Sequence, residues 1–323
     1  MQRILVLFGG TSSEREVSLK SGQAVADGLR EIGHIVETHD LQQDSLAHLD
    51  LSEYTFVFNA LHGGYGENGG LQRELDRAGV TYSGSGPIAC RLAMDKELTK
   101  AQFLARRVPT APYTVISKSD SAARIKRSVN RLGLPLVIKP VNEGSSVGVS
   151  IVKSAAEVKK AVEEAFQFGE RVMLEQYIAG REFTVAIIGA RAYPVIEIAP
   201  AREFYDYAAK YTDGGTRYIL TPELSDLQAK LAQYHAKRAY NSLRCHGYGR
   251  VDLMLDADGE FHVLEVNTLP GMTARSLLPQ AAAQAGLGFE EALQAMIDAS
   301  CAPRRTIPLT SEERDAPKQR SAA

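Results

Sequence analysis

The chain has 323 residues, of which 44% are hydrophobic and 24% charged, and its formal net charge is −2. This composition is typical of a globular protein with two or three domains, and the near-neutral charge gives no electrostatic reason to expect nucleic acid or an anionic membrane as a partner. Without an apolar run of roughly 18 residues, a secretory signal pattern or clustered cysteines, the sequence predicts a cytoplasmic protein with neither a membrane span nor a disulfide framework or cysteine zinc site.

Residues 1–93 alternate strand and helix patterns and predict a small parallel-sheet domain of α/β class. Residues 3–8, RILVLF, have the apolar run of a buried strand, and they lead into Gly9-Gly10. An amphipathic helix is expected over 13–32, with Ser13 as its N-cap. The later elements expected here are strands at 54–61 and 80–86 with a helix at 70–79 between them.

Residues 94–180 predict a second α/β unit. Its expected elements are helices at 94–106, 121–133 and 155–169 and strands at 113–117, 135–140, 149–153 and 171–178. From Arg181 the pattern becomes antiparallel, with strands at 182–189, 191–200 and 251–266, so the third segment, 181–302, has α+β character. The polar stretch 200–222 is long for a connection, which predicts a lid or binding loop, and the tail at 303–323 is expected to be disordered.

Two carboxylates interrupt the apolar strands of GRVDLMLDADGEFHVLEVN, residues 249–267. Asp258-Gly259 predicts a hairpin with a two-residue loop. In that register Asp252 lies opposite Glu265, and alternation places Asn267 on the same face. The reverse face then collects the apolar residues Val251, Leu253, Leu255, Leu264 and Val266. A three-residue loop would move Glu265 to the other face unless a β-bulge corrected the shift.

The two facing acids need a positive partner, because carboxylates on adjacent strands repel each other. Carboxylate and amide oxygens suit Mg²⁺, which usually takes one or two carboxylates together with substrate phosphates. Arg250, beside them, is suited to stabilising a developing oxyanion. The alternative is that one acid pairs with Arg250 while the other faces solvent.

A phosphate site is predicted in LPLVIKPVNEGSSVGVS, residues 134–150. Its buried strand ends in Lys139, and the following loop, 143–148, offers backbone N–H groups and hydroxyls that can cradle an anion. Lys96, early in a predicted helix, can also reach a phosphate. The chain contains no Walker A pattern, and this loop joins strand to strand. The alternative is a tight Gly/Ser turn without a ligand.

Two other motifs are less specific. GSGPIA at 84–89 fits a loose G-x-G-x-x-A dinucleotide fingerprint but lacks the acid expected about 20 residues later. In RVMLEQYIAGREFTV, Glu175 and Glu182 flank a segment, 176–178, that can offer backbone hydrogen bonds to a base, with an acid near the ribose hydroxyls. The alternative for these acids is a solvated surface position.

Taken in order, these segments resemble the D-alanine–D-alanine ligase family, which has the ATP-grasp fold. The resemblance covers residues 3–300 and rests on LFGGTSSEREVSLKSG, ALHGGYGENGGLQ, YSGSG with AMDKELTK, VIKPVNEGSSVGVS, EFTVAI, FYDYAAKY, GRVDLMLD and LEVNTLPGMTARSLLP. It implies three domains, 1–93, 94–180 and 181–302. It also implies ATP-dependent joining of two D-alanine molecules through a D-alanyl phosphate, for peptidoglycan precursors, with two Mg²⁺ ions, Mn²⁺ as a substitute, and a homodimer.

The resemblance assigns a role to individual residues. Those matched to ATP binding are Lys96, Lys139, Gly144, Ser146, Glu175, Gln176, Tyr177, Ile178, Glu182 and Lys210. Those matched to the metal are Asp252, Glu265 and Asn267. The catalytic set is Glu14, which pairs with the first substrate's ammonium group, Ser145 and Tyr211, which bond to it and hold the lid shut, and Arg250 and Gly271 on the oxyanion side. The binders of the second substrate are Ser276 and Leu277, with His62 lining the same cavity.

The chain departs from the family pattern at two positions. Asn68 replaces an acid in GENG, where we expect the loop to survive with the loss of a salt contact, and Ala208 replaces an acid of the lid motif. Three alternatives stay open: a related ligase that uses D-lactate or D-serine, a dehydrogenase built on GSGPIA, and a non-catalytic nucleotide sensor. Tyr211 counts against D-lactate, the dehydrogenase leaves the hairpin acids and the loop at 139–148 unexplained, and a sensor would not need Glu14, Arg250 and Ser276 together.

Overall fold

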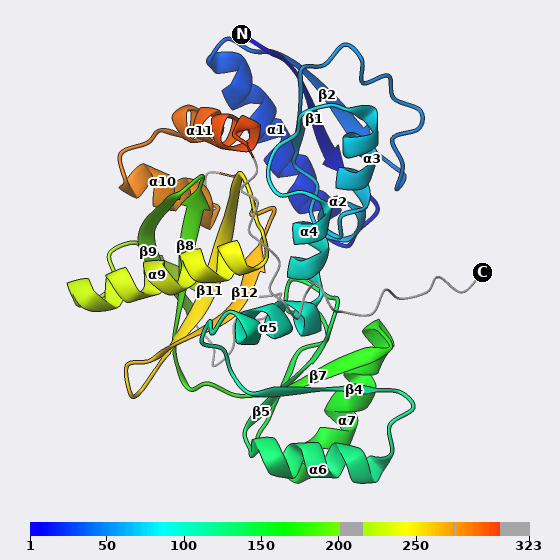
Figure 1. The fold of residues 1–323 in the computed structure, drawn as a ribbon, viewed down its shortest axis with the longest axis vertical. Helices are drawn as coiled ribbons and strands as arrows, with labels where there is room; N and C mark the ends of the chain where they lie inside the picture. The colour runs from blue at the N-terminus through cyan, green and yellow to red at the C-terminus, as the bar shows by residue number, and fades with distance from the viewer. Residues whose placement is uncertain (201–215, 274, 304–323) are drawn as a thin grey trace.

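Three β-sheets form the framework of the chain in a computed structural model that describes residues 1–200, 216–273 and 275–303 (Figure 1). The predicted tail, Lys210, Tyr211, Ala208 and most of the predicted lid lie outside the described residues. Each sheet falls within one of the three segments expected from the sequence, except that β8 of the third sheet begins at Gly180, and the segment boundaries themselves stay a prediction. Among the described helices, none is long and apolar enough to cross a membrane.

The N-terminal sheet is parallel and has the order β2-β1-β3, as the α/β pattern predicts. Its elements are β1 (Arg3–Gly9), α1 (Arg15–Glu31), β2 (Ile35–Leu41), β3 (Phe56–Asn59), α2 (Gly64–Glu67) and α3 (Gly70–Ala78). The sequence analysis missed β2 because this edge strand is mostly exposed and polar, and so lacks an apolar pattern. The strand expected at 80–86 is reduced to a single bridge between Val57 and Tyr82.

Helix α1 begins two residues later than predicted. Ser13 is not its N-cap: Glu14 holds that position, and its side chain makes no capping hydrogen bond. The Ser12 hydroxyl instead donates to the carbonyl of His62 at 2.5 Å, which ties this turn to the segment after β3. The wrong prediction matters for the site, because the Glu14 carboxylate is left available for a more distant partner.

The helix predicted at 94–106 corresponds to α5 (Lys96–Ala105), and a helix that the sequence analysis did not assign, α4 (Pro87–Met94), precedes it. Asp95 separates them in an extended conformation, and its side chain accepts a hydrogen bond from Leu98 N at 3.0 Å. Asp95 is therefore the N-cap of α5, and Lys96 is the first residue of that helix. In Figure 1, α5 lies between the middle and C-terminal sheets.

The middle sheet has the order β4-β7-β5-β6 and is antiparallel throughout. Its elements are β4 (Tyr113–Ser117), α6 (Ala122–Leu132), β5 (Leu136–Pro140), β6 (Ser150–Val152), α7 (Ala155–Ala165), η1 (Phe166–Phe168) and β7 (Arg171–Gln176). Antiparallel pairing therefore begins in the middle sheet, whereas the sequence analysis placed its start at Arg181. Helices α6 and α7 cover one face, and the aliphatic residues of both sides form a closed core.

The C-terminal sheet has the order β10-β9-β8-β11-β12 and is antiparallel. Its strands are β8 (Gly180–Ile188), β9 (Arg191–Pro200), β10 (Thr216–Ile219), β11 (Tyr248–Asp256) and β12 (Phe261–Asn267). Because β10 pairs with β9, part of the stretch predicted as a loop at 200–222 is regular strand. Three helices that the sequence analysis did not assign follow along the chain: α9 (Asp226–Ser242), α10 (Leu277–Gln284) and α11 (Phe289–Cys301).

The C-terminal helices pack against the N-terminal elements, as Figure 1 shows for α11 beside α1. One continuous core contains residues of β1, β3 and α1 together with residues of β8, β9, α10 and α11. Gly28 permits the close approach of α1 and α11, since a Cβ there would lie 2.9 Å from the Leu293 side chain. The opposite face of the C-terminal sheet packs on α9 and on Phe103 of α5. The cleft described below lies between the middle and C-terminal sheets.

Candidate active site

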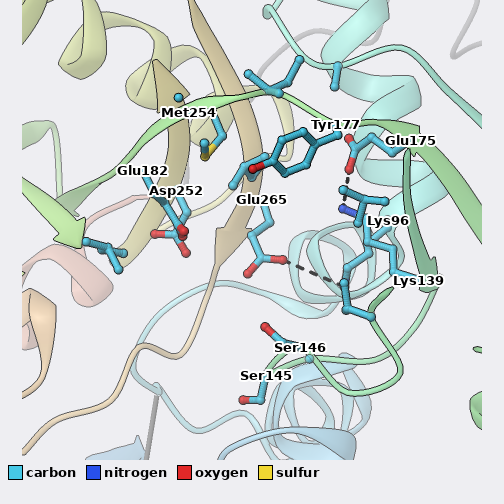
Figure 2. Close-up of a pocket in the computed structure, with 18 of the residues that line it drawn as sticks. Lys96, Lys139, Ser145, Ser146, Glu175, Tyr177, Glu182, Asp252, Met254 and Glu265 are labelled. Carbon is cyan, nitrogen blue, oxygen red and sulfur yellow. Dashed lines mark hydrogen bonds and ion pairs between the residues drawn. The ribbon is translucent and has the colours of Figure 1, made fainter. Parts of the chain in front are cut away.

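A cleft of about 350 Å³ separates the middle and C-terminal sheets. Figure 2 shows Asp252, Glu182 and Met254 on one side and Lys139 and Glu175 on the other. The predicted site residues that line the cleft are Lys96, Lys139, Gly144, Ser145, Ser146, Glu175, Gln176, Tyr177, Ile178, Glu182, Asp252 and Glu265. Residues from two of the three expected segments, 94–180 and 181–302, thus meet here, as the ATP-grasp resemblance implies.

The hairpin β11–β12 pairs Asp252 with Glu265, as predicted, but its loop length and register differ from the prediction. Leu255 pairs with Phe261, and Asp256 N donates to Glu260 O at 3.0 Å, so the loop has three residues. A β-bulge then shifts the register by one residue beyond Leu253 and restores the Asp252–Glu265 pair.

The bulge changes the position of one residue. Leu264 lines the cleft and does not join the reverse apolar face, where the sequence analysis placed it. That face contains Val263 in its stead, together with Val251, Leu253, Leu255 and Val266. Leu264 and Met254 supply apolar wall where the sequence predicted only polar groups, so the C-terminal sheet offers both an acidic and an apolar surface to a ligand.

Asp252 is 4% exposed, and both of its carboxylate oxygens accept hydrogen bonds. Arg250 Nε and Thr184 Oγ1 donate to Oδ1 at 2.9 and 2.6 Å. The second Arg250 nitrogen and Asn267 Nδ2 donate to Oδ2, both at 2.9 Å. Asn267 therefore turns its amide nitrogen toward Asp252, which orients the amide oxygen as the group left for a cation. The pairing of one acid with Arg250, which the sequence left open as an alternative, is present as a bidentate bond inside the fold.

Glu265 is the more open of the two acids, with a side chain 31% exposed, and its Oε2 lies 4.0 Å from Lys96 Nζ. The oxygen donors of Asp252, Glu265 and Asn267 have the chemistry that Mg²⁺ prefers. Within the described ranges, no group of three or more His, Cys, Asp or Glu side chains could hold a metal ion by itself. The donor set therefore fits a cation that arrives with further oxygen ligands, such as phosphates.

The loop after β5 carries the backbone features of an anion site. Ser145 and Ser146 have φ angles of 49° and 60°, in the left-handed region that non-glycine residues rarely adopt. Lys96 Nζ donates to the carbonyl of Glu143 at 2.5 Å, so the first residue of α5 is bonded to the start of the loop. The positive φ angles turn successive backbone groups to one side of the loop, which is the geometry of an anion-binding concavity.

Glu175, on β7, binds two buried lysines. Lys139 Nζ donates to Oε2 at 2.5 Å, and Lys100 Nζ donates to Oε1. Burial, opposed by Glu265 and reinforced by Lys96, lowers the pKa of Lys139 to about 8. Burial and the neighbouring Lys139 lower the pKa of Lys100 well below its usual value. Lys100 was not among the predicted residues, although its spacing from Lys96 (i, i+4) places both lysines on one face of the helix.

The segment predicted to bind a base, 176–178, follows at the end of β7, an inner strand of the middle sheet. Gln176 N donates to Pro112 O at 2.9 Å, and Tyr177 N donates to Pro135 O at 3.2 Å. Apolar residues that line the cleft with this segment are Ala111, before β4, Val137 on the middle sheet, and Met254 and Leu264 on the C-terminal sheet. A planar base placed between them would be covered on both faces, with backbone groups at its edge.

A second pair of charges missed by the sequence analysis lies on the C-terminal side of the cleft. Arg181 donates two hydrogen bonds to Glu197, at 2.9 and 2.6 Å, and one to the carbonyl of Glu223 at 3.0 Å. Both members line the cleft, beside Glu182. Their separation in sequence gives no local motif, because the pair forms across strands β8 and β9.

A hydrogen bond connects the residue before α1 with the loop after β5. Ser145 Oγ donates to Glu14 Oε1 at 2.5 Å. A Cβ at Gly63 would lie 2.9 Å from Glu14 Oε2, so the chain passes close to this carboxylate. The predicted association of Glu14 with Ser145 is thus present, while its partner Tyr211 lies outside the described residues.

Of the residues predicted to hold a second substrate, His62 follows β3, and Ser276 and Leu277 are at the start of α10. His62 is 6% exposed; its Nδ1 donates to Leu269 O and its Nε2 accepts from Ser21 Oγ, both at 3.1 Å. Ser276 Oγ accepts from Thr273 N at 3.0 Å. Leu277 differs from the others, because its side chain belongs to the hydrophobic core. Only its backbone N–H, at the first turn of α10, is suited to an anion.

Three other predicted features have a defined place. A Cβ at Gly271 would lie 2.8 Å from Ser276 Oγ, so a side chain there would crowd Ser276. Asn68 Oδ1 accepts a hydrogen bond from Gly70 N at 2.8 Å, so the substituted residue still orders its loop. The GSGPIA motif has a structural contact, since Gly84 N donates to Ser300 Oγ at 2.9 Å. None of its residues lines the cleft.

Comparison with known proteins gives a consistent picture. Residues 103–298 match a family model described as D-ala D-ala ligase C-terminus. The chain is 42% identical over 299 residues to a D-alanine–D-alanine ligase of Actinobacillus pleuropneumoniae serotype 5b, covering 93% of this chain and 98% of the relative. It resembles the structure of a D-alanine–D-alanine ligase from Bacillus anthracis complexed with ATP, with a TM-score of 0.83, 32% identity, and coverage of 93% and 97%. It also resembles VanG D-Ala:D-Ser ligase from Enterococcus faecalis, with a TM-score of 0.84, 27% identity, and coverage of 93% and 99%.

Proposed function

The chain belongs to the D-alanine–D-alanine ligase family, and from that premise we propose that it joins two D-alanine molecules at the expense of ATP. The product, D-alanyl-D-alanine, serves peptidoglycan precursors. The observation that carries this proposal is the Glu14–Ser145 hydrogen bond, because it connects a carboxylate suited to an amino acid's ammonium group with a loop suited to phosphate. A nucleotide sensor would have no use for this connection.

Lys96, Lys139 and the loop at 143–148 are the groups we propose for the triphosphate. Both ammonium groups line the cleft, and the loop provides hydroxyls and backbone N–H groups beside them. The base would bind at 176–178, with Glu182 near the ribose. Phosphoryl transfer asks little covalent chemistry of a protein, so positioning and charge stabilisation are the contributions expected from these residues.

In the first step, a carboxylate oxygen of one D-alanine attacks the γ-phosphorus of ATP, the bond to ADP breaks, and D-alanyl phosphate forms. Glu14 would hold the ammonium group of this D-alanine, with Ser145 fixing the Glu14 carboxylate. In the second step, the amine of another D-alanine attacks the acyl carbon, loses a proton, and inorganic phosphate leaves. Ser276, the Leu277 N–H and His62 would hold this second molecule.

Arg250 and Gly271 are proposed for the oxygen that becomes negative in the second step. Arg250 is already fixed by its bidentate bond to Asp252, which is the kind of preorganisation that charge stabilisation requires. Asp252, Glu265 and Asn267 would hold Mg²⁺, as two ions with Mn²⁺ able to replace it, and when bound the metal would neutralise phosphate charge. Lys210 and Tyr211 keep their proposed roles at the γ-phosphate and the lid.

Further proposals follow from the family. We propose that the protein acts in the cytoplasm, where its substrates are available, and that it forms a homodimer. The domain boundaries near residues 93 and 180 are part of the same proposal.

The test is phosphate release from ATP with D-alanine, L-alanine, D-serine and D-lactate supplied in turn, with each product identified by mass. We expect release with D-alanine and a product of two D-alanine residues. Release with D-alanine only when D-serine is also present would favour a D-alanine–D-serine ligase, the activity named for the E. faecalis relative. An absence of release with every substrate, in a chain that binds ATP, would contradict the ligase proposal.

A further inference from the structure

A buried lysine outside the predicted site lies behind the nucleotide cleft. Lys100, on α5, is 1% exposed, yet it ends in a charged group. Lysine is seldom buried this deeply without a partner, because removing an ammonium group from water is costly. The proposed reaction gives Lys100 no substrate to touch, so its burial needs another explanation.

The hydrogen bonds that begin at Lys100 reach both halves of the cleft. Its Nζ donates to Glu175 Oε1 on β7 and, at 2.6 Å, to Thr110 Oγ1. Thr110 Oγ1 in turn donates to the carbonyl of Val263 on β12 at 2.7 Å. On the other side, the second oxygen of Glu175 accepts from Lys139 at 2.5 Å.

These bonds form one continuous chain under the floor of the cleft. It begins at Lys139, a cleft-lining residue of β5, and runs through Glu175, Lys100 and Thr110 to β12, two residues before Glu265. The phosphate side and the acidic side of the cleft are thus bonded to the same ammonium group. Such a network fixes relative positions well because its inner members, Glu175, Lys100 and Thr110, are each held by two partners.

The burial of Glu175 explains why this residue could not hold Lys139 in a fixed position without Lys100. Its carboxylate is 3% exposed, and with Lys139 as its only partner its other oxygen would be buried without a donor. The Glu175 side chain would then be free to rotate, and Lys139 would follow it. With Lys100 on Oε1, the direction of the bond to Lys139 is set by the fold.

We propose that Lys100 is a positioning residue for the nucleotide, which acts through Glu175 to hold Lys139 at the wall of the cleft. This inference rests on the proposed nucleotide site and extends it. Lys100 touches neither substrate in this arrangement. Its loss should therefore weaken nucleotide binding far more than binding of D-alanine, whose proposed contacts begin at Glu14 and Ser145.

The test compares Lys100→Met, Glu175→Gln and the double variant with the unaltered protein. Affinity for ADP with Mg²⁺ is measured by titration calorimetry, and the KM values for ATP and D-alanine are measured by phosphate release. We expect Lys100→Met to weaken ADP binding about tenfold, equivalent to roughly 1.4 kcal/mol, and to raise the KM for ATP similarly. The KM for D-alanine should change less than about twofold.

Because Lys100 acts through Glu175, the two substitutions should not be additive. In the Glu175→Gln background, Lys100→Met should leave ADP affinity unchanged. This comparison also serves if Lys100→Met alone fails to fold, since the double variant leaves no unpaired buried carboxylate. A further tenfold loss in the double variant would contradict the proposal.

Phe103→Leu is the matched control for a purely structural role. Phe103 is on the same helix and fully buried, and it packs against the C-terminal sheet, while its apolar side chain takes no part in the hydrogen bonds of Lys100 and Glu175. It should lower the melting temperature while ADP affinity stays within about twofold of the unaltered protein. An equal loss of ADP affinity in Phe103→Leu, or unchanged affinity in Lys100→Met, would overturn the role of Lys100. An unaltered chain that binds no ADP would contradict the proposed function itself, and the role of Lys100 with it.

Discussion

The two hairpin acids should respond differently to removal of their charge, although both belong to the proposed metal site. In Asp252→Asn, the new amide NH₂ must face one of the donors that now bond to the carboxylate, and Arg250 loses its buried counter-charge. Breaking a buried pair in this way costs about 3 kcal/mol. Glu265→Gln removes the ion pair with Lys96, and a pair at 4.0 Å with a partly exposed acid is worth less than about 1 kcal/mol.

These free energies translate into melting temperatures. An unfolding entropy of about 2.1 cal/mol/K per residue gives about 0.7 kcal/mol/K for a chain of 323 residues. Asp252→Asn should therefore melt about 4 °C lower than the unaltered protein, and Glu265→Gln about 1 °C lower or less. Both variants should lose ATP turnover by a factor of about 100 or more, because both remove an oxygen ligand of the proposed metal.

The assay pairs calorimetric melting with D-alanine-dependent phosphate release, both at fixed Mg²⁺. Glu260→Gln is the control, since this exposed acid belongs to the same hairpin and lies outside the cleft. It should leave both measurements unchanged. Turnover in Glu265→Gln within threefold of the unaltered protein would refute its metal role, and an unchanged melting temperature in Asp252→Asn would refute the bonding described for its carboxylate.

Three other predictions follow from the structure. Glu14→Gln should raise the KM for D-alanine at least tenfold with little change in the KM for ATP, and steady-state kinetics with an unchanged KM for D-alanine would remove Glu14 from the first substrate's site. Burial lowers the pKa of Lys139 to about 8, and the protonated form binds phosphate, so kcat/KM for ATP should be highest below this pH and fall as the pH rises through about 8; a flat profile would contradict the role of Lys139. Gly28→Ala should lower stability by about 1–3 kcal/mol, because its Cβ would lie 2.9 Å from Leu293, and an unaltered denaturation midpoint would show that α11 can move away.

The pairing of Asp252 with Glu265 could be predicted from the sequence, but the loop length and the register of the hairpin could not. Alternation and the Asp258-Gly259 pair led to the correct pairing of Asp252 with Glu265, although the loop has three residues and the register is corrected by a bulge. No local pattern marks this bulge, because Leu264 is apolar whether it faces the core or the cleft. The sequence therefore predicted the polar half of the wall and missed the apolar half.

Other omissions have a similar cause, which is that their partners are distant in sequence. Lys100 lies 75 residues from Glu175, and only the folded sheet brings them together. Its spacing from Lys96 was a usable signal, since two lysines on one helical face repel each other unless acids lie nearby. The edge strand β2 was missed for a different reason: its exposed residues need no apolar pattern, because pairing with β1 depends on backbone groups alone.

The balance of charges in the cleft bears on how a nucleotide can enter it. Among the described residues that line it, three are basic (Lys96, Lys139 and Arg181) and six are acidic (Glu143, Glu175, Glu182, Glu197, Asp252 and Glu265), an excess of three carboxylates. Lys100 and Arg250, behind the wall, offset two of these charges through Glu175 and Asp252. A triphosphate without cations would therefore meet a wall that is negative overall, in a partly enclosed site where repulsion is weakly screened. Divalent cations bound to the phosphates turn this electrostatic repulsion into attraction. The same carboxylates that would exclude the free nucleotide therefore favour its magnesium complex.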